Sequence, residues 1–183
     1  MNLLGSARAQ DYRQFCTLHR ASVGHSSKNR CHVSDIANSA PEFPNGMMVA
    51  HFITSGDVER SRRFYTDVLG GEVVFRFGEL TYVRLANAFI IINVGGGPTD
   101  DKPTVILEVP SNPDRVNSFL NLRVADIHAK YAEWSAKGAQ FVTPPVQHDY
   151  EIRCYIRDPD GYLIEVGQTT DPAGDWTAWL VEN

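Results

Sequence analysis

The feature that most constrains the fold of this chain is an internal duplication. A pattern of one strand, one helix and three strands occurs over residues 47–97 and again over residues 117–170. In both copies an aspartate precedes an amphipathic helix and a glycine follows it, as expected for an N-cap and a C-terminal stop. The matched positions are Asp57 with Asp126, Val58 with Ile127, Tyr65 with Trp134, Gly70 with Gly138, and residues 93–95 with residues 165–167. One such unit cannot bury its sheet alone, so the duplication predicts an α+β fold of two tandem βαβββ repeats, with paired curved mixed sheets around a cleft.

Three further segments surround these repeats. Residues 1–45 are polar and lack sustained periodicity, which predicts a flexible N-terminal extension before a domain over residues 46–170. Residues 98–116 form a loop-rich connection between the repeats. Residues 171–183 form a C-terminal tail with two tryptophans, Trp176 and Trp179, which we expect to fold over the domain or over a partner subunit.

Composition disfavours several function classes. The net charge is −5 and no basic run occurs, which disfavours nucleic-acid binding. The chain has no apolar run of membrane-spanning length, and its first residues form no continuous hydrophobic segment of the signal-peptide kind. Three cysteines at no framework spacing are typical of a reduced compartment. We therefore expect a cytoplasmic protein with neither a nucleic-acid nor a membrane partner.

Glu165 is the first candidate functional residue. It follows a well-specified turn, in which Pro159 fixes φ and Gly161 accepts positive φ, and it stands among aliphatic residues of the next strand. An ionised carboxylate in such a strand is costly unless it faces water, a cation or a metal. Glu165 is therefore predicted to face a site rather than the core.

Taken together, the motifs resemble those of the vicinal oxygen chelate superfamily, which includes glyoxalase I, bleomycin-resistance proteins and extradiol dioxygenases. The residues that carry the resemblance are 57–65, 68–70, 122–126, 157–161 and 164–165. The resemblance covers roughly residues 47–170 and specifies the fold. It does not specify the reaction, because this fold supports several chemistries and also metal-free binders.

The resemblance implies four metal-ligand positions, on the first and last strand of each repeat. These positions hold His51 (or Ala50, if the register differs by one residue), Asn93, Phe119 and Glu165. His51 and Glu165 are competent ligands and are also the predicted catalytic residues, whereas Asn93 and Phe119 are expected to contact substrate. Two protein ligands are few for zinc, nickel, iron or manganese, so a divalent metal remains one alternative and a metal-free site the other. No organic cofactor is expected.

Two further side chains are expected to line the cleft. Tyr155 lies on the strand before Glu165, and His148 lies on the preceding segment, from which a loop could reach over the site. A small-molecule ligand is therefore expected, bound by residues from both repeats.

Two functions follow from the resemblance. The first is a glyoxalase-like lyase or isomerase acting on a small oxygenated metabolite, in which a metal polarises oxygens and Glu165 or His51 moves a proton. The alternative is a metal-free binding or resistance protein of the bleomycin-resistance type, favoured by Phe119 and Asn93. A dioxygenase is disfavoured, because Phe119 stands where it needs a second histidine. The repeats are compatible with a closed monomer or with a homodimer.

Overall fold

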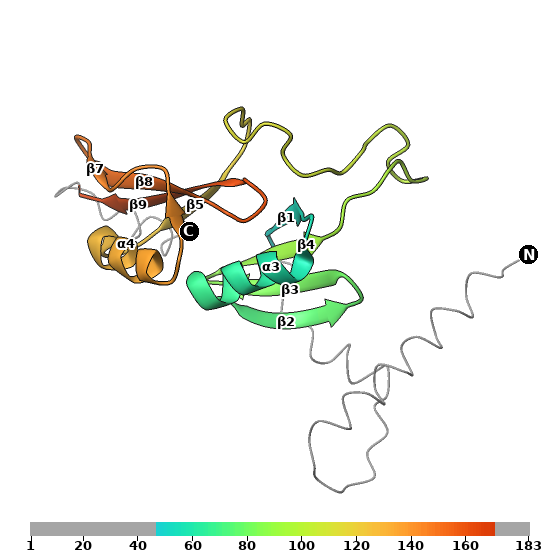
Figure 1. Ribbon diagram of the computed structural model, residues 1–183, viewed down its shortest axis with the longest axis horizontal. Helices are drawn as coiled ribbons and strands as arrows, with labels where there is room; N and C mark the ends of the chain where they lie inside the picture. The colour runs from blue at the N-terminus through green and yellow to red at the C-terminus, as the bar shows by residue number, and fades with distance from the viewer. Residues whose placement is uncertain (1–46, 171–183) are drawn as a thin grey trace, which may run out of the picture. The chain divides into compact units, whose positions relative to one another are not determined.

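The computed structural model describes residues 47–170, so the expected N-terminal extension and C-terminal tail lie outside the described residues (Figure 1). Within this part, two mixed sheets are accompanied by few helices, which confirms the predicted α+β class. No helix of the described part is long and apolar enough to cross a membrane.

The first repeat forms a four-stranded sheet covered by one helix. Strand order is β1-β4-β3-β2, with β1 parallel to β4 and the other pairs antiparallel. The elements are β1 (Ala50–Thr54), α3 (Val58–Arg63), a π-helical turn (Phe64–Val68), β2 (Glu72–Phe77), β3 (Leu80–Leu85) and β4 (Ala88–Asn93). Figure 1 shows α3 across one face of this sheet.

The second repeat follows the same plan with a less regular edge. Its sheet has the order β5-β9-β8-β6, and β7 also pairs with β8. The elements are β5 (Leu120–Arg123), α4 (Ile127–Ala136), β6 (Gln140–Phe141), β7 (Val146–Gln147), β8 (Glu151–Arg157) and β9 (Leu163–Thr169). The duplication is thus visible in part, since two short strands replace the hairpin edge of the first repeat.

Helix ends follow from the sequence as predicted. The Asp57 side chain accepts a hydrogen bond from the Arg60 amide at 2.9 Å, and Asp126 accepts one from the Ala129 amide at 2.9 Å. Gly70 and Gly138 adopt φ of +82° and +94°, which only glycine adopts without strain. The two caps therefore fix equivalent starting points for both helices.

Each sheet buries one face against its own helix. Ile53, Val83 and Ile90 pack beneath α3, and Ile156 and Ile164 belong to the same buried cluster in the second repeat. Full burial of such a side chain stabilises the fold by about 1.5–3 kcal/mol. Because side chains alternate along a strand, every second residue points to the opposite face, which is called here the open face of each sheet.

The turn between β8 and β9 joins the two repeats. Asp160 accepts hydrogen bonds from the Gly56 amide at 3.0 Å and from the Ser61 hydroxyl at 2.6 Å, both at the start of α3. Asp158 accepts one from the Tyr65 hydroxyl at 3.1 Å. The turn that the sequence singled out therefore attaches the second repeat to the first.

Candidate active site on the open face of the second sheet

Glu165 occupies the centre of the open face of the second sheet. It pairs with Asn121 on β5 and with Tyr155 on β8, so these three side chains form one row across the sheet. Its neighbours Ile164 and Val166 point the other way, into the core. The period-two pattern around Glu165 thus places a carboxylate on a face that no helix of its own repeat covers.

Neutral hydrogen-bond donors hold this carboxylate. The Asn121 amide donates to Oε1 at 2.6 Å, and the Tyr155 hydroxyl donates to Oε2 at 2.6 Å. Glu165 is only 7% exposed, and its hydrogen bond is the main cause that raises the pKa of the Tyr155 phenol. Each carboxylate oxygen can accept a second bond, so the group remains able to take a proton.

Arg123 extends the row into a charged network. Its guanidinium lies 2.8 Å from Glu151 and 3.9 Å from Glu165, and it donates to the Thr169 hydroxyl at 2.9 Å. Arg153 lies 2.9 Å from the other oxygen of Glu151. The hydrogen bond from Arg123 is the main cause that lowers the pKa of Glu151, so this carboxylate is ionised at neutral pH.

Gly167 makes room for Arg123. A Cβ atom at this position would lie 2.0 Å from the Arg123 Nη1 atom, well inside van der Waals contact. A glycine in the interior of a strand commonly marks such a close approach. Arg123 and Gly167 were not among the predicted site residues; a glycine directly after the predicted strand that carries Glu165 was the available signal.

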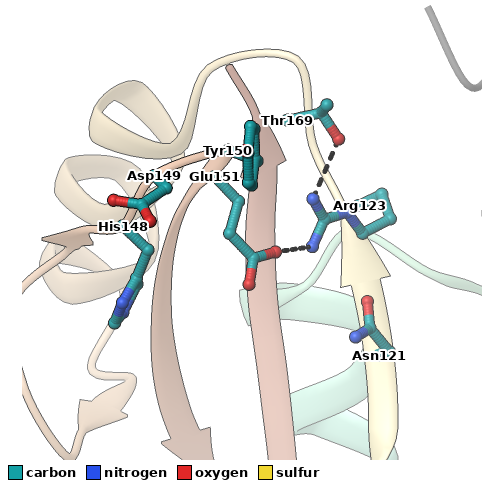
Figure 2. A pocket seen from close by; sticks show the side chains of 7 residues that line it. All are labelled: Asn121, Arg123, His148, Asp149, Tyr150, Glu151 and Thr169. Carbon is teal, nitrogen blue, oxygen red and sulfur yellow. Dashed lines mark hydrogen bonds and ion pairs between the residues drawn. The ribbon is translucent and has the colours of Figure 1, made fainter. Parts of the chain in front are cut away.

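A hollow of about 720 Å³ opens beside this network (Figure 2). Figure 2 shows the contacts of Arg123 with Glu151 and Thr169. The lining residues are Asn121, Arg123, His148, Asp149, Tyr150, Glu151 and Thr169. The hollow therefore begins where the Glu165 row ends, since Asn121 belongs to both.

The structure brings three predicted site residues close to the Glu165 row. Tyr155 belongs to the row, and the Phe119 ring packs edge-on against the Tyr155 ring at a centroid distance of 6.1 Å. His148 lines the neighbouring hollow. These residues all come from the second repeat.

The two predicted residues of the first repeat lie elsewhere. His51 pairs with Ile90, so it lies on the face of its sheet that packs against α3. It is half-buried there, and desolvation lowers the pKa of its imidazole. Asn93 lies on the open face, where its side chain accepts a hydrogen bond from the Val94 amide at 2.9 Å. Among the described contacts, none joins His51 to Glu165.

Strand register changes which residue corresponds to Glu165 in the first repeat. The last pairs before the capping aspartates are Thr54 with Asn93 and Arg123 with Gly167. Asn93 is therefore equivalent to Gly167, and Ile91 is equivalent to Glu165. The sequence comparison that matched Asn93 with Glu165 was displaced by two residues.

The open face of the first sheet is consequently apolar. The row equivalent to Asn121, Glu165 and Tyr155 consists of Phe52, Ile91 and Tyr82. Phe75 packs edge-on against Tyr82 at a centroid distance of 5.7 Å. The same fold thus carries one polar and one apolar open face.

The donor set does not fit a divalent metal. Members of this superfamily often use one, and His51 with Glu165 was the predicted pair. Within residues 47–170, no three His, Cys, Asp or Glu side chains gather as a metal site requires. His51 faces α3, and no described contact joins it to Glu165.

Several curated proteins are similar in sequence. A probable lactoylglutathione lyase from Synechocystis is 30% identical over 136 residues, which cover 68% of this chain and 97% of that protein. A biphenyl-2,3-diol 1,2-dioxygenase from Rhodococcus globerulus is 26% identical over 64% of this chain and 61% of its own length. A probable chloroplastic lactoylglutathione lyase from Arabidopsis thaliana is 28% identical, but this chain spans only 35% of its length.

Solved structures share the fold at lower identity. A glyoxalase/bleomycin resistance protein/dioxygenase from Nocardioides has a TM-score of 0.57 at 17% identity, with 78% of this chain and 95% of that chain covered. TnmS3, an antibiotic binding protein from Streptomyces, has a TM-score of 0.51 at 18% identity, with 68% and 97% covered. The sequence profile of one superfamily matches residues 48–166. The chain belongs to the Glyoxalase/Bleomycin resistance protein/Dioxygenase superfamily.

Proposed function

We propose that this glyoxalase-like protein is a lyase or isomerase that acts on a small oxygenated molecule, with Glu165 as the group that moves a proton. The observation that carries the proposal is the position of the Glu165 carboxylate. It is nearly buried, and it lies on the open face of its sheet. Asn121 and Tyr155 hold it at 2.6 Å each. A nearly buried carboxylate with neutral donors is a common arrangement for a general base.

The proposed chemistry is proton abstraction from a carbon next to a carbonyl group. Glu165 takes the proton and forms a carboxylic acid, the electron pair of the C–H bond forms a C=C bond, and the π pair of the carbonyl group moves onto its oxygen to give an enolate. Asn121 has a second amide N–H that can donate to that oxygen, whereas the single O–H of Tyr155 is directed at Glu165 and orients the base. Return of the proton to the neighbouring carbon gives an isomer, and loss of a leaving group gives a lyase reaction.

His51 remains a prediction as a second catalytic residue. Its position on the α3 side of the first sheet gives it no described route to Glu165 within the contacts of residues 47–170.

We further propose that the complete cleft forms in a homodimer. Phe52 and Phe77 of the first sheet are 42% and 40% exposed, and Phe119 beside the Glu165 row is 44% exposed. Exposed apolar side chains on the open faces are what a partner surface would cover. The apolar open face of one copy would then cover the polar open face of another and exclude water from Glu165.

Metal-free binding without catalysis is the second candidate. It is favoured by the apolar row around Ile91 and by the fold shared with TnmS3, which is named an antibiotic binding protein. In that case the two open faces hold a ligand, and Glu165 serves only as a hydrogen-bond acceptor.

One experiment separates the two candidates. The protein is incubated in D₂O with lactoylglutathione, the compound named for its relatives, and with small neutral α-hydroxyketones. Turnover and deuterium incorporation at carbon are followed by NMR for the wild type, for Glu165→Gln and for the surface control Glu133→Gln. We expect exchange in the wild type and in the control, and a loss of at least 100-fold in Glu165→Gln. Binding without exchange in the wild type would reject the enzyme and favour the binding protein.

A further inference from the structure

The charged groups around Glu165 balance one another. Arg123 and Arg153 both bind Glu151, at 2.8 and 2.9 Å. Arg123 also lies 3.9 Å from Glu165. The two arginines and two glutamates form an alternating chain of positive and negative charge with no net charge.

The other strand arginine on the polar open face also has a carboxylate neighbour. Arg157 lies 2.7 Å from Asp114, which neutralises it. Asp149 lines the hollow and contributes a further carboxylate. The three arginines and the four carboxylates of this face therefore have a net charge of −1. The carboxylates are Asp114, Asp149, Glu151 and Glu165.

The apolar face of the first sheet does not change this balance. Its charged residue Arg84 is paired with Glu72. Across the described strands no lysine occurs, and every arginine lies within 4.0 Å of a carboxylate oxygen. The described strands therefore offer a bound anion no arginine or lysine that lacks a carboxylate neighbour.

From this balance, and resting on the proposed function of the Glu165 site, we infer that the substrate is an uncharged, oxygen-rich molecule and not an anionic conjugate such as lactoylglutathione. The glutathione part of that conjugate carries two carboxylates and one ammonium group, so it brings net negative charge to a face that is already negative. Like charges near a protein surface repel even at several ångströms, which weakens binding by about tenfold or more.

Neutral hydrogen-bonding groups fit an uncharged molecule well. Asn121 and Tyr155 both donate and accept, and the Thr169 hydroxyl lies at the edge of the hollow. The edge-on pair of Phe119 and Tyr155 supplies an apolar surface for the carbon skeleton. Sites of this composition select a ligand by shape and hydroxyl placement rather than by charge.

Two matched ligand pairs test the inference. Lactamide and lactate have the same skeleton and differ in charge. N-acetylated lactoylglutathione can be compared with its diester; acetylation removes the ammonium group, so the diester is uncharged and the free acid carries two negative charges. Binding to the full chain is measured from amide chemical shifts of Asn121, Arg123 and Glu151, and turnover is measured in parallel. We expect lactamide and the diester to bind at least about tenfold more tightly than lactate and the free acid. The difference in affinity within each pair should become smaller in Asp149→Asn and stay unchanged in the control Asp100→Asn.

These binding measurements can fail without the proposed catalytic role of Glu165 failing. Equal or tighter binding of the anionic member of each pair overturns the inference, and the proposed function stands if Glu165→Gln abolishes turnover of that ligand. Absence of amide shifts with all four ligands also overturns the inference. Whether Glu165 then acts in catalysis is decided separately by the deuterium exchange experiment with α-hydroxyketones.

Discussion

The Tyr155 hydroxyl donates a hydrogen bond of 2.6 Å to the Glu165 carboxylate across adjacent strands. The ring of the same tyrosine packs against Phe119. Tyr155 thus connects the apolar and polar parts of the open face, and it fixes the orientation of the carboxylate. The bond also raises the pKa of the phenol, so Tyr155 keeps its proton at neutral pH.

Removal of this hydroxyl should lower the rate more than the affinity. In Tyr155→Phe the ring packing against Phe119 is kept, whereas Glu165 loses one donor. We expect kcat to fall about 10- to 100-fold with KM changed less than threefold, because the hydroxyl orients the carboxylate that moves the proton and that orientation matters mainly in the transition state. Steady-state kinetics measure both values, with Tyr131→Phe on α4 as the matched control. An unchanged kcat in Tyr155→Phe would show that Glu165 needs no phenol.

A methyl group at Gly167 should displace Arg123. The Cβ of alanine would lie 2.0 Å from the guanidinium, and the flexible arginine side chain can move where a backbone could not. We expect Gly167→Ala to fold, to lose about 1–2 kcal/mol of unfolding free energy from the broken bonds to Glu151 and Thr169, and to lose at least tenfold in kcat/KM. Urea denaturation and kinetics measure these changes.

Gly97→Ala is the control for this effect. Among residues 47–170, apart from its two chain neighbours, no atom lies within 4 Å of the position of a Cβ at Gly97, so the added methyl group meets open space. We expect its stability and kinetics to match the wild type. Wild-type kinetics in Gly167→Ala would mean that the position of Arg123 is irrelevant to the site.

His51→Gln tests the second predicted catalytic residue. Since the register places His51 beside Ile90 on the α3 side, we expect the rate of deuterium exchange to change less than about twofold. The substitution removes a half-buried imidazole, so a small change in the midpoint of thermal unfolding is expected. A loss comparable with that of Glu165→Gln would restore His51 to the site and contradict this reading of the register.

The sequence predicted the α+β class and the ends of the helices because these signals are local. Capping aspartates, terminating glycines and the turn before Glu165 each act within a few residues, and all lie where they were expected. The position of Glu165 on an open face also followed from its neighbours, because a carboxylate among aliphatic residues must point away from them. These predictions needed no knowledge of distant contacts.

Strand register depends on distant residues, and the predicted match between the two repeats was wrong by two residues. Matching Asn93 with Glu165 relied on residues that look alike after the strand, whereas the structure aligns Ile91 with Glu165. A shift of one residue decides whether His51 faces α3 or the open face. Arg123 was missed for the same reason, since its role depends on a glycine of another strand.

The turn between β8 and β9 should make the stability of the fold depend on pH. Asp158 is buried, and desolvation raises the pKa of its carboxyl to about 6 despite hydrogen bonds from Tyr65 and from the backbone amides of Asp160 and Tyr162. A carboxyl whose pKa is higher in the folded state favours folding when it is protonated. Its contribution is therefore fully present below the unfolded value near 4, and is lost as pH rises through 6. The expected loss is roughly 2–3 kcal/mol.

Asp158→Asn should remove this pH dependence without removing the turn. An asparagine oxygen can still accept from the two backbone amides, and its NH₂ group can donate to the Tyr65 hydroxyl. We expect the free energy of unfolding of the wild type minus that of Asp158→Asn to fall between pH 4.5 and pH 7.5, as measured by urea denaturation at each pH. Taking this difference cancels the titration of the exposed pairs Glu59–Arg62 and Glu133–Lys137, which both proteins share. A difference that stays constant over this range would mean that Asp158 is already ionised throughout, with its three donors outweighing the cost of burial.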